Sequence, residues 1–241
     1  MKNCRAALLT LAPFSLANGL SVVSAVDDLQ VATSTQVDTG GILSIASAMF
    51  HTTNVNMQGG SVYGALGLYL DEIGNVSGHG RLFGDVDLGT SGTIAGSGAG
   101  LELFGHVFGS GTLSGTTLFG NVDIGSSPGA ITLEDVVLSS AGTTTFEVAG
   151  IDPSQFDRLT LVGSVALDGT AQISFDSFTP DPSDTFQLID LTGGTASNWF
   201  SSVVAPAGWT LSSGGLLAVP EPSTLILALA ALAMLPHRRR R

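Results

Sequence analysis

Short hydrophobic runs separated by glycine dominate the middle of the chain, over residues 59–150. The runs are rich in Val, Leu, Ile, Phe and Thr, and 22 of the 32 glycines fall among them. No stretch of ten residues in this region repeats its apolar positions with the 3.6-residue period of a helix. Because β-branched and aromatic residues favour strands and glycine favours turns, the pattern predicts an all-β protein of short strands and tight turns.

A five-residue unit occurs three times in this region, at unequal intervals. Its copies are Leu82-Phe83-Gly84-Asp85-Val86, Leu103-Phe104-Gly105-His106-Val107 and Leu118-Phe119-Gly120-Asn121-Val122. The intervals are close to the roughly 20 residues of strand and turn that one turn of a β-solenoid requires. We therefore expect residues 26–150 to form a parallel β-helix, or β-solenoid, of short glycine-punctuated rungs. Inward apolar residues would alternate with outward small or polar ones, and glycine would lie at corners where stacked backbones come close.

The phenylalanine of each repeat unit allows two interpretations. Phe83, Phe104 and Phe119 either stack inside the core or form an exposed ladder that contacts sugar rings. Phenylalanine lacks the polar group of Tyr and Trp, and equivalent positions of a solenoid usually stack inside. We therefore expect a buried stack.

Residues 151–219 have fewer glycines and longer alternating runs than the repeat region. Residues 164–167 and 170–175 flank Asp168-Gly169, a favoured two-residue turn, and this predicts a β-hairpin. We expect residues 151–219 to form a strand-rich C-terminal cap, because the last turn of a solenoid would otherwise expose an open sheet edge.

Residues 1–25 have the order of a secretory signal peptide. Lys2 and Arg5 precede an apolar stretch, and cleavage is expected between Ala25 and Val26. This predicts an N-terminal signal helix and an exported mature chain. The single cysteine, Cys4, lies inside the segment, so neither a disulfide nor a zinc site is expected in the mature protein.

The other end combines a proline-rich break, a short apolar run and a basic cluster. Val219-Pro220-Glu221-Pro222 precedes the apolar residues 224–235, and Arg238, Arg239, Arg240 and Arg241 follow. The run is shorter than the roughly 20 residues of a comfortable membrane span. The arginines would stop the chain on the cytoplasmic side, so the pattern predicts a single transmembrane helix that serves as a temporary anchor.

This order of motif, helix and arginines resembles the PEP-CTERM sorting signal of Gram-negative bacteria, with Pro220, Glu221 and Pro222 matching the motif. The resemblance implies that residues 220–241 are processed by an exosortase, a membrane cysteine protease. It implies export, transient attachment to the inner membrane through the C-terminal helix, and a final place at the cell surface or outside the cell. The implied partners are the exosortase, the secretion machinery and extracellular polysaccharide.

Residues 120–219 also resemble the end of solenoid proteins that carry autotransporter-associated β-strand repeats. The similarity is carried by Ser127-Pro128-Gly129-Ala130-Ile131, Phe156-Asp157-Arg158-Leu159-Thr160-Leu161 and Asp184-Thr185-Phe186-Gln187-Leu188-Ile189-Asp190. This resemblance implies a right-handed parallel β-helix with a strand-rich C-terminal cap.

The charge balance excludes a nucleic-acid-binding protein. The chain has 8 basic and 20 acidic residues, a formal net charge of -12, and only Arg81 and Arg158 are basic within residues 26–219. Binding to phosphate needs a basic face, which this chain lacks.

Candidate chemistry is limited to isolated histidines and one set of carboxylates. His51, His79 and His106 stand alone in the sequence, so we expect no catalytic role for them. Three aspartates are the only candidates for a metal or acid/base site: Asp85, Asp87 and Asp123. Asp85 and Asp87 share a strand face, and Asp123 holds the repeat position of Asp87, so stacked turns would align them for calcium or general acid–base chemistry. The alternative is a solvated acidic face, and we expect no resident metal and no cofactor.

These observations predict a non-enzymatic exported protein of the cell envelope or extracellular matrix, with a structural or adhesive role. Two alternatives remain open. The first is a polysaccharide-active enzyme on the same scaffold, with Asp85, Asp87 and Asp123 as its acids. The second is a carbohydrate-binding module that uses Trp199 and Trp209 as sugar platforms, unless these side chains pack in the core of the cap.

Overall fold

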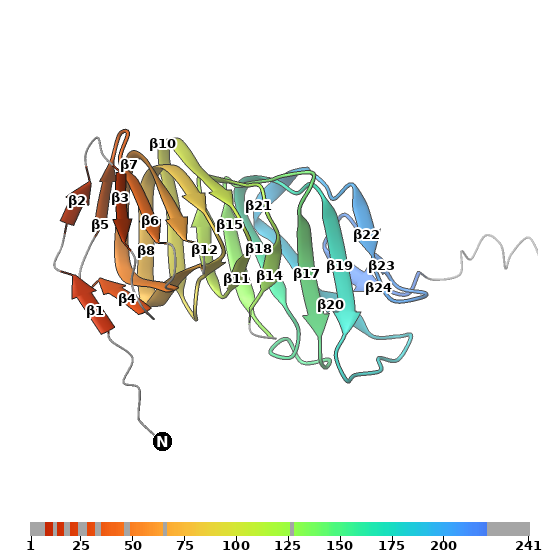
Figure 1. Ribbon diagram of the computed structural model, residues 1–241. Coiled ribbons are helices and arrows are strands. Elements are labelled where there is room, and N and C mark those ends of the chain that lie inside the picture. The colour runs from red at the N-terminus through yellow and green to blue at the C-terminus, as the bar shows by residue number, and fades with distance from the viewer. Residues whose placement is uncertain are drawn as a thin grey trace, which may run out of the picture.

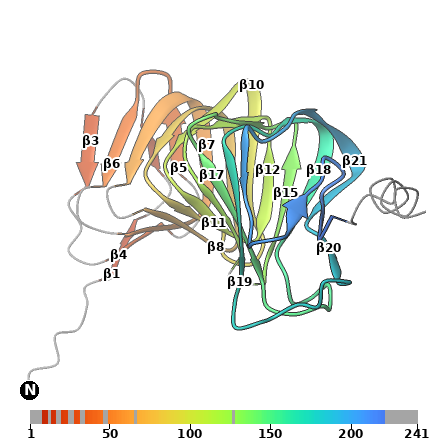
Figure 2. The ribbon, with the colours of Figure 1, turned by 90° about the vertical axis from the view of Figure 1, so that its right-hand side faces the viewer.

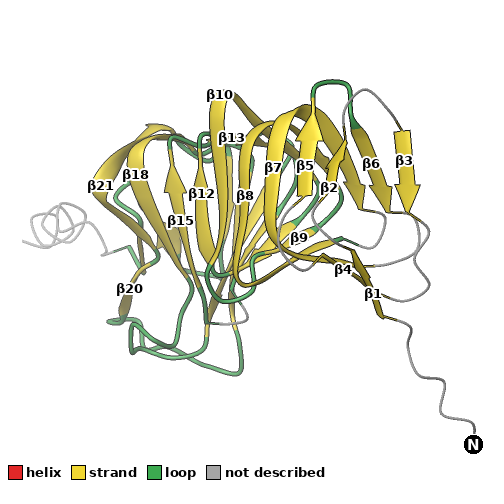
Figure 3. Ribbon diagram, turned by 90° about the vertical axis from the view of Figure 1, so that its left-hand side faces the viewer, coloured by secondary structure: helices red, strands yellow, loops and turns green. Residues whose placement is uncertain are grey.

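The computed structural model describes residues 8–11, 14–16, 20–23, 28–31, 35–45, 49–64, 67–125 and 128–220. Within these ranges the protein is all-β, which confirms the predicted class, and nearly all strand pairs are parallel. Figure 3 shows strands and loops throughout the part drawn in colour. None of the described residues forms a helix long and apolar enough to cross a membrane.

The parallel strands form three columns, and each turn of the chain contributes one strand to each column. Successive turns follow the long axis of the molecule from β1 to β22 (Figure 1). The first column holds β1 (Leu8–Leu11), β4 (Asp28–Val31), β9 (Val86–Asp87), β11 (Val107–Gly109), β14 (Val122–Ile124), β17 (Thr143–Val148), β19 (Thr170–Phe175) and β22 (Ser202–Val204). The second column holds β2 (Phe14–Leu16), β5 (Thr35–Asp38), β12 (Gly111–Ser114) and β15 (Ala130–Glu134). The third column holds β3 (Leu20–Val23), β6 (Ile42–Ile45), β13 (Thr116–Leu118) and β16 (Val137–Leu138).

Five long strands bend from one column into the next. The strands β7 (Met49–Gly64) and β8 (Leu68–Phe83) run through all three columns. The strands β10 (Gly92–Phe104), β18 (Arg158–Ala166) and β21 (Ile189–Asn198) run through the second and third. These bends join the columns into one continuous sheet.

The predicted repeat sets the register between turns. Leu103 pairs with Leu82 on the turn before and with Leu118 on the turn after, so the three copies of the unit lie directly beside one another. The length of a turn varies along the first column. Ala171 and its partner Val203 are more than twice as far apart in the sequence as Val107 and its partner Val122.

The core is a set of aliphatic stacks inside the three columns. One stack in the second column consists of Val55, Val76, Ile94, Leu113, Leu133 and Leu161, all buried and in register. Burial of each such side chain stabilises the fold by about 1.5–3 kcal/mol. Because every stack continues from turn to turn, the core is one cluster along the described chain.

The glycine of the repeat unit lies at the corner between the third column and the next turn. A Cβ added at Gly84, Gly105 or Gly120 would meet the carbonyl oxygen of the equivalent glycine one turn earlier. Stacked backbones therefore touch at this corner, as predicted, and only glycine leaves room for the contact.

The N-terminal signal helix is not formed by the described residues of segment 1–25, so that part of the fold prediction is wrong for them. They form β1, β2 and β3, which pair in parallel with Asp28–Val31, with β5 and with β6. The backbone groups thus find partners on the next turn, and Pro13 and Gly19 disfavour a continuous helix in this stretch. The predicted C-terminal helix lies outside the described residues.

The hairpin predicted around Asp168-Gly169 is also wrong. The strands β18 and β19 do not pair with each other; β18 pairs with β15, β16 and β21, whereas β19 pairs with β17 and β22. Asp168-Gly169 instead makes a corner between columns. A tight turn of this kind suits a corner of the chain as well as a β-hairpin. The parallel pairing thus continues beyond residue 150. Three further strands form one antiparallel sheet: β20 (Thr185–Gln187), β23 (Thr210–Leu211) and β24 (Leu216–Ala218). Figure 2 looks at this end of the molecule.

Candidate functional site

An aromatic ladder follows the outer face of the third column. Tyr63, Phe83, Phe104 and Phe119 stack in sequence, with ring centroids 4.4, 4.8 and 4.7 Å apart and interplanar angles of 1°, 11° and 6°. Tyr63 is 40% exposed and Phe119 is 44% exposed. The predicted buried stack is therefore wrong. Successive residues of a strand point to opposite faces, so the buried leucine of each repeat unit places the following phenylalanine outside.

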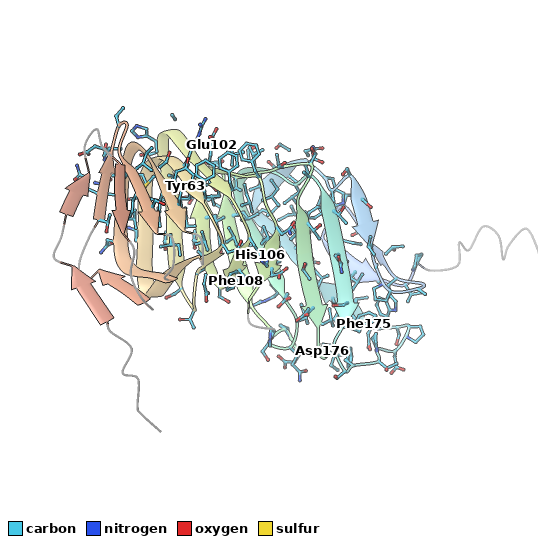
Figure 4. The ribbon with its side chains drawn as sticks, viewed as in Figure 1. Tyr63, Glu102, His106, Phe108, Phe175 and Asp176 are labelled. Carbon is cyan, nitrogen blue, oxygen red and sulfur yellow. The ribbon has the colours of Figure 1, made fainter. Side chains whose placement is uncertain are left out.

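The ladder presents ring edges to solvent, because each inner ring has its two faces covered by its neighbours. Sugar rings bind to aromatic faces, and only the outward faces of the end rings, Tyr63 and Phe119, are not covered by another ring of the ladder. Stacked pairs contribute about 0.5–1.5 kcal/mol each. The arrangement therefore stabilises the stacking of turns and offers little area to a glycan. The position of Tyr63 is labelled in Figure 4.

The three candidate aspartates do not form one site. Phe108 is the register partner of both Asp87 and Asp123, so its aromatic side chain separates the two carboxylates. The Oδ1 atom of Asp87 accepts a hydrogen bond from the N–H of Gly89 at 2.8 Å, and Oδ1 of Asp85 accepts one from the N–H of His106 at 2.9 Å. Asp85 thus holds the backbone of the next turn, and Asp87 holds the backbone of its own turn. Among the described residues, no group of three or more His, Cys, Asp or Glu side chains is arranged to hold a metal ion.

Asp123 belongs to a different polar cluster, which the sequence did not reveal. Its Oδ2 lies 2.9 Å from Nε2 of His106, and it lines a cavity of about 120 Å³ together with Glu147 and Asp157. Asp157 is 1% exposed, and its two carboxylate oxygens accept hydrogen bonds from the N–H groups of Gly129 at 2.8 Å and Glu147 at 2.7 Å. Both oxygens are engaged, so Asp157 holds the chain before β15 against β17.

Burial raises the pKa of Asp157 to about 6. The two N–H donors act in the opposite direction, and the nearby charges of Glu147 and Asp123 add to the rise. A carboxyl group that titrates near neutral pH is common at catalytic sites, but structural groups show it too. Because the oxygens of Asp157 are occupied by backbone donors, the geometry favours a structural role.

The two tryptophans pack against the hydrophobic core. The ring of Trp209 lies 5.2 Å from that of Phe175 in a T-shaped contact, and the ring of Trp199 lies 5.7 Å from that of Phe200. Both side chains are partly buried, so neither is a free sugar platform. Phe175 is labelled at the end of β19 in Figure 4.

Two larger hollows lie on the surface of the described chain. A groove of about 350 Å³ follows glycine backbone beside His79, Arg81 and Glu102; Nε of Arg81 lies 2.7 Å from Oε2 of Glu102. A cavity of about 620 Å³ lies near the antiparallel sheet, and its walls include Arg158, Asp190 and Thr192. Neither hollow could be anticipated from local sequence patterns, because the residues of each come from separate turns.

Comparisons with protein families, with curated proteins and with solved structures found no match to this chain. The predicted cleavage residues Ala25 and Val26, the motif residues Glu221 and Pro222, and the terminal arginines lie outside the described residues, as does the side chain of His51. Pro220 is the last described residue and is exposed.

Proposed function

We propose that this is an exported structural or adhesive protein of the cell envelope or extracellular matrix, whose body is a parallel β-solenoid. The observation that carries the proposal is the register between turns: strand follows strand in three parallel columns, with a continuous core and stacked corner glycines. Such a body is a rod whose stability comes from contacts between neighbouring turns. It would comprise residues 26–150, with residues 151–219 as its cap.

The formal net charge of -12 supports a role in a hydrated matrix, because like charge keeps neighbouring rods apart and divalent cations can bridge them to anionic polysaccharide. The separation of Asp87 from Asp123 by Phe108 removes the acid pair on which the enzyme alternative rested. We therefore keep a non-enzymatic role as the proposal.

The cellular location of the protein is part of the proposal. Residues 1–25 would direct export, and residues 220–241 would hold the chain at the inner membrane until an exosortase acts at the Pro220-Glu221-Pro222 motif. The released body would then reside at the cell surface or outside the cell.

Mass spectrometry of the protein purified from its own host tests this proposed export and processing. We expect a chain that starts at Val26 and ends near Pro220-Glu221-Pro222. A matched variant with alanine at Pro220, Glu221 and Pro222 should retain Arg241 and remain in the membrane fraction. A wild-type protein that keeps both Lys2 and Arg241 and fractionates with the cytoplasm would overturn the proposal.

A further inference from the structure

The cavity of about 620 Å³ is an open hollow at the C-terminal end of the described chain, and most of the residues that line it are exposed. It lies between the loop before β18, the start of β21 and the turn before β24, and Figure 2 shows these elements at one end of the molecule. Its volume falls within the range of small-molecule sites, about 300–1,000 Å³. Pro153, Phe156 and Leu191 supply apolar wall, and Arg158, Asp190 and Thr192 supply polar groups.

Arg158 is the unpaired arginine of the described chain. Of the two arginines within residues 26–219, Arg81 forms an ion pair with Glu102 at 2.7 Å. The guanidinium of Arg158 has no hydrogen bond or ion pair within the described residues, and its side chain is exposed at the cavity. A guanidinium carries five N–H donors in a fixed fork, so this group is free to donate to a ligand.

Asp190 supplies the matching acceptor. Its Oδ1 accepts a hydrogen bond from the N–H of Thr192 at 2.9 Å. The backbone and hydroxyl of Thr192, and then the charge of Arg158, hold the pKa of Asp190 below its usual value, so the carboxylate is ionised at neutral pH. An ionised carboxylate has about four acceptor positions. The hydrogen bond from the N–H of Thr192 uses one of these positions, so other acceptor positions of Asp190 remain open to the cavity.

The chemistry of the walls selects the class of ligand. A hexose ring has apolar C–H faces and pairs of adjacent hydroxyls, which can accept from a guanidinium and donate to a carboxylate. The polar walls hold one cation and one anion, whose charges cancel, and the chain as a whole carries -12. An anionic sugar would be repelled by the surrounding field, whereas a neutral one would not.

We propose that this cavity binds a neutral hexose unit of a polysaccharide, with Arg158 and Asp190 as the residues that recognise its hydroxyls and with Pro153, Phe156 and Leu191 against its apolar surface. The inference rests on the proposed adhesive function and deepens it, because it gives the rod a specific attachment point at one end. The two tryptophans are not needed for this recognition.

Isothermal titration calorimetry on the protein purified from its host tests the site. The probes are laminarihexaose, cellohexaose and mannohexaose as neutral hexasaccharides, and hexagalacturonate as the anionic comparison. We expect at least one neutral probe to bind, and Arg158→Ala and Asp190→Asn each to weaken that binding by about tenfold or more, since each removes a hydrogen bond to a charged group. Arg81→Ala, which removes the other arginine of the body, should leave the affinity within about twofold of wild type.

Folding of each variant is checked by its thermal unfolding midpoint. Arg158→Lys is a milder change, which keeps the positive charge and loses the forked N–H donors of the guanidinium. Its affinity for the neutral probe should therefore lie between those of wild type and Arg158→Ala. The proposal is overturned if no neutral probe binds, if folded Arg158→Ala and Asp190→Asn bind as wild type does, or if hexagalacturonate binds more tightly than every neutral probe. An exported and processed protein that fails this assay refutes the site alone, whereas binding by a protein found in the cytoplasm refutes the proposed location alone.

Discussion

The outward position of the aromatic ladder can be tested with a single oxygen atom. Phe119→Tyr adds a hydroxyl to a ring that is 44% exposed, and the ladder already contains a tyrosine, Tyr63, that is 40% exposed. Phe146→Tyr adds the same hydroxyl to a ring that is 0% exposed. The two substitutions are chemically identical, so any difference in stability reports the environment of the ring.

The expected magnitudes differ clearly. The new hydroxyl on Phe119 can remain in water, and surface substitutions of this kind change the free energy of unfolding by less than about 0.5 kcal/mol. On Phe146 the hydroxyl would lose its water partners inside an aliphatic core, at a cost of about 1–3 kcal/mol. Crowding of a packed core would add about 1–3 kcal/mol. We therefore expect Phe146→Tyr to be the more destabilising by at least about 1 kcal/mol.

Equilibrium unfolding in guanidinium chloride, followed by circular dichroism, gives both values from proteins purified in the same way. The slope of the transition should stay the same in the two variants, so that the shift in midpoint reports stability. If Phe119→Tyr is as destabilising as Phe146→Tyr, the ring of Phe119 is buried and the ladder is an internal stack.

Two further predictions concern the contacts between turns. The pKa of Asp157 is raised from 3.8 to about 6, so the folded protein binds this proton more tightly than the unfolded chain. The free energy of unfolding should therefore fall as the pH rises from about 4 to about 6, by at most about 3 kcal/mol. Unfolding midpoints that stay flat or rise over this pH range contradict the raised pKa of Asp157. Gly120→Ala should destabilise the fold by several kcal/mol in the same unfolding assay, because the new Cβ would strike the carbonyl oxygen of Gly105. Gly214→Ala is the control and should be tolerated, because the atom nearest to its new Cβ would be 3.6 Å away. Equal effects of the two substitutions would contradict the close contact at the corner.

Much of the scaffold could be predicted from the sequence, because its signals are local and repeated. The units at Leu82, Leu103 and Leu118 indicated the strand class and the stacking of turns. The exact register is seen only in the structure, where residues at one repeat position meet directly on stacked turns. The side of each phenylalanine was mispredicted for a simple reason: a shift of one residue exchanges the inner and outer faces of a strand. The buried leucine beside it was the better guide, and Val62-Tyr63-Gly64 follows the same pattern as Leu-Phe-Gly.

The polar sites were harder to predict, because they depend on what lies between the repeats. Alignment of Val107-Phe108 with Val86-Asp87 would have placed an aromatic ring between Asp87 and Asp123, so this signal was present in the sequence. No such signal exists for Asp157, Arg158 or Asp190. Their surroundings combine strand residues with loops from turns of unequal length, and the sequence does not show which of these segments meet.

The unequal turns have a consequence for how such a chain can evolve. The short turn from Val107 to Val122 shows how little chain one circuit needs. Along the first column, the two longest turns end at β19 and β22, and two residues before β18 in the first of them, Pro153 and Phe156, line part of the cavity. Insertions and deletions at such corners can therefore change the surface of the molecule without shifting the strands of the parallel sheet, so the surface and the core are free to diverge at different rates.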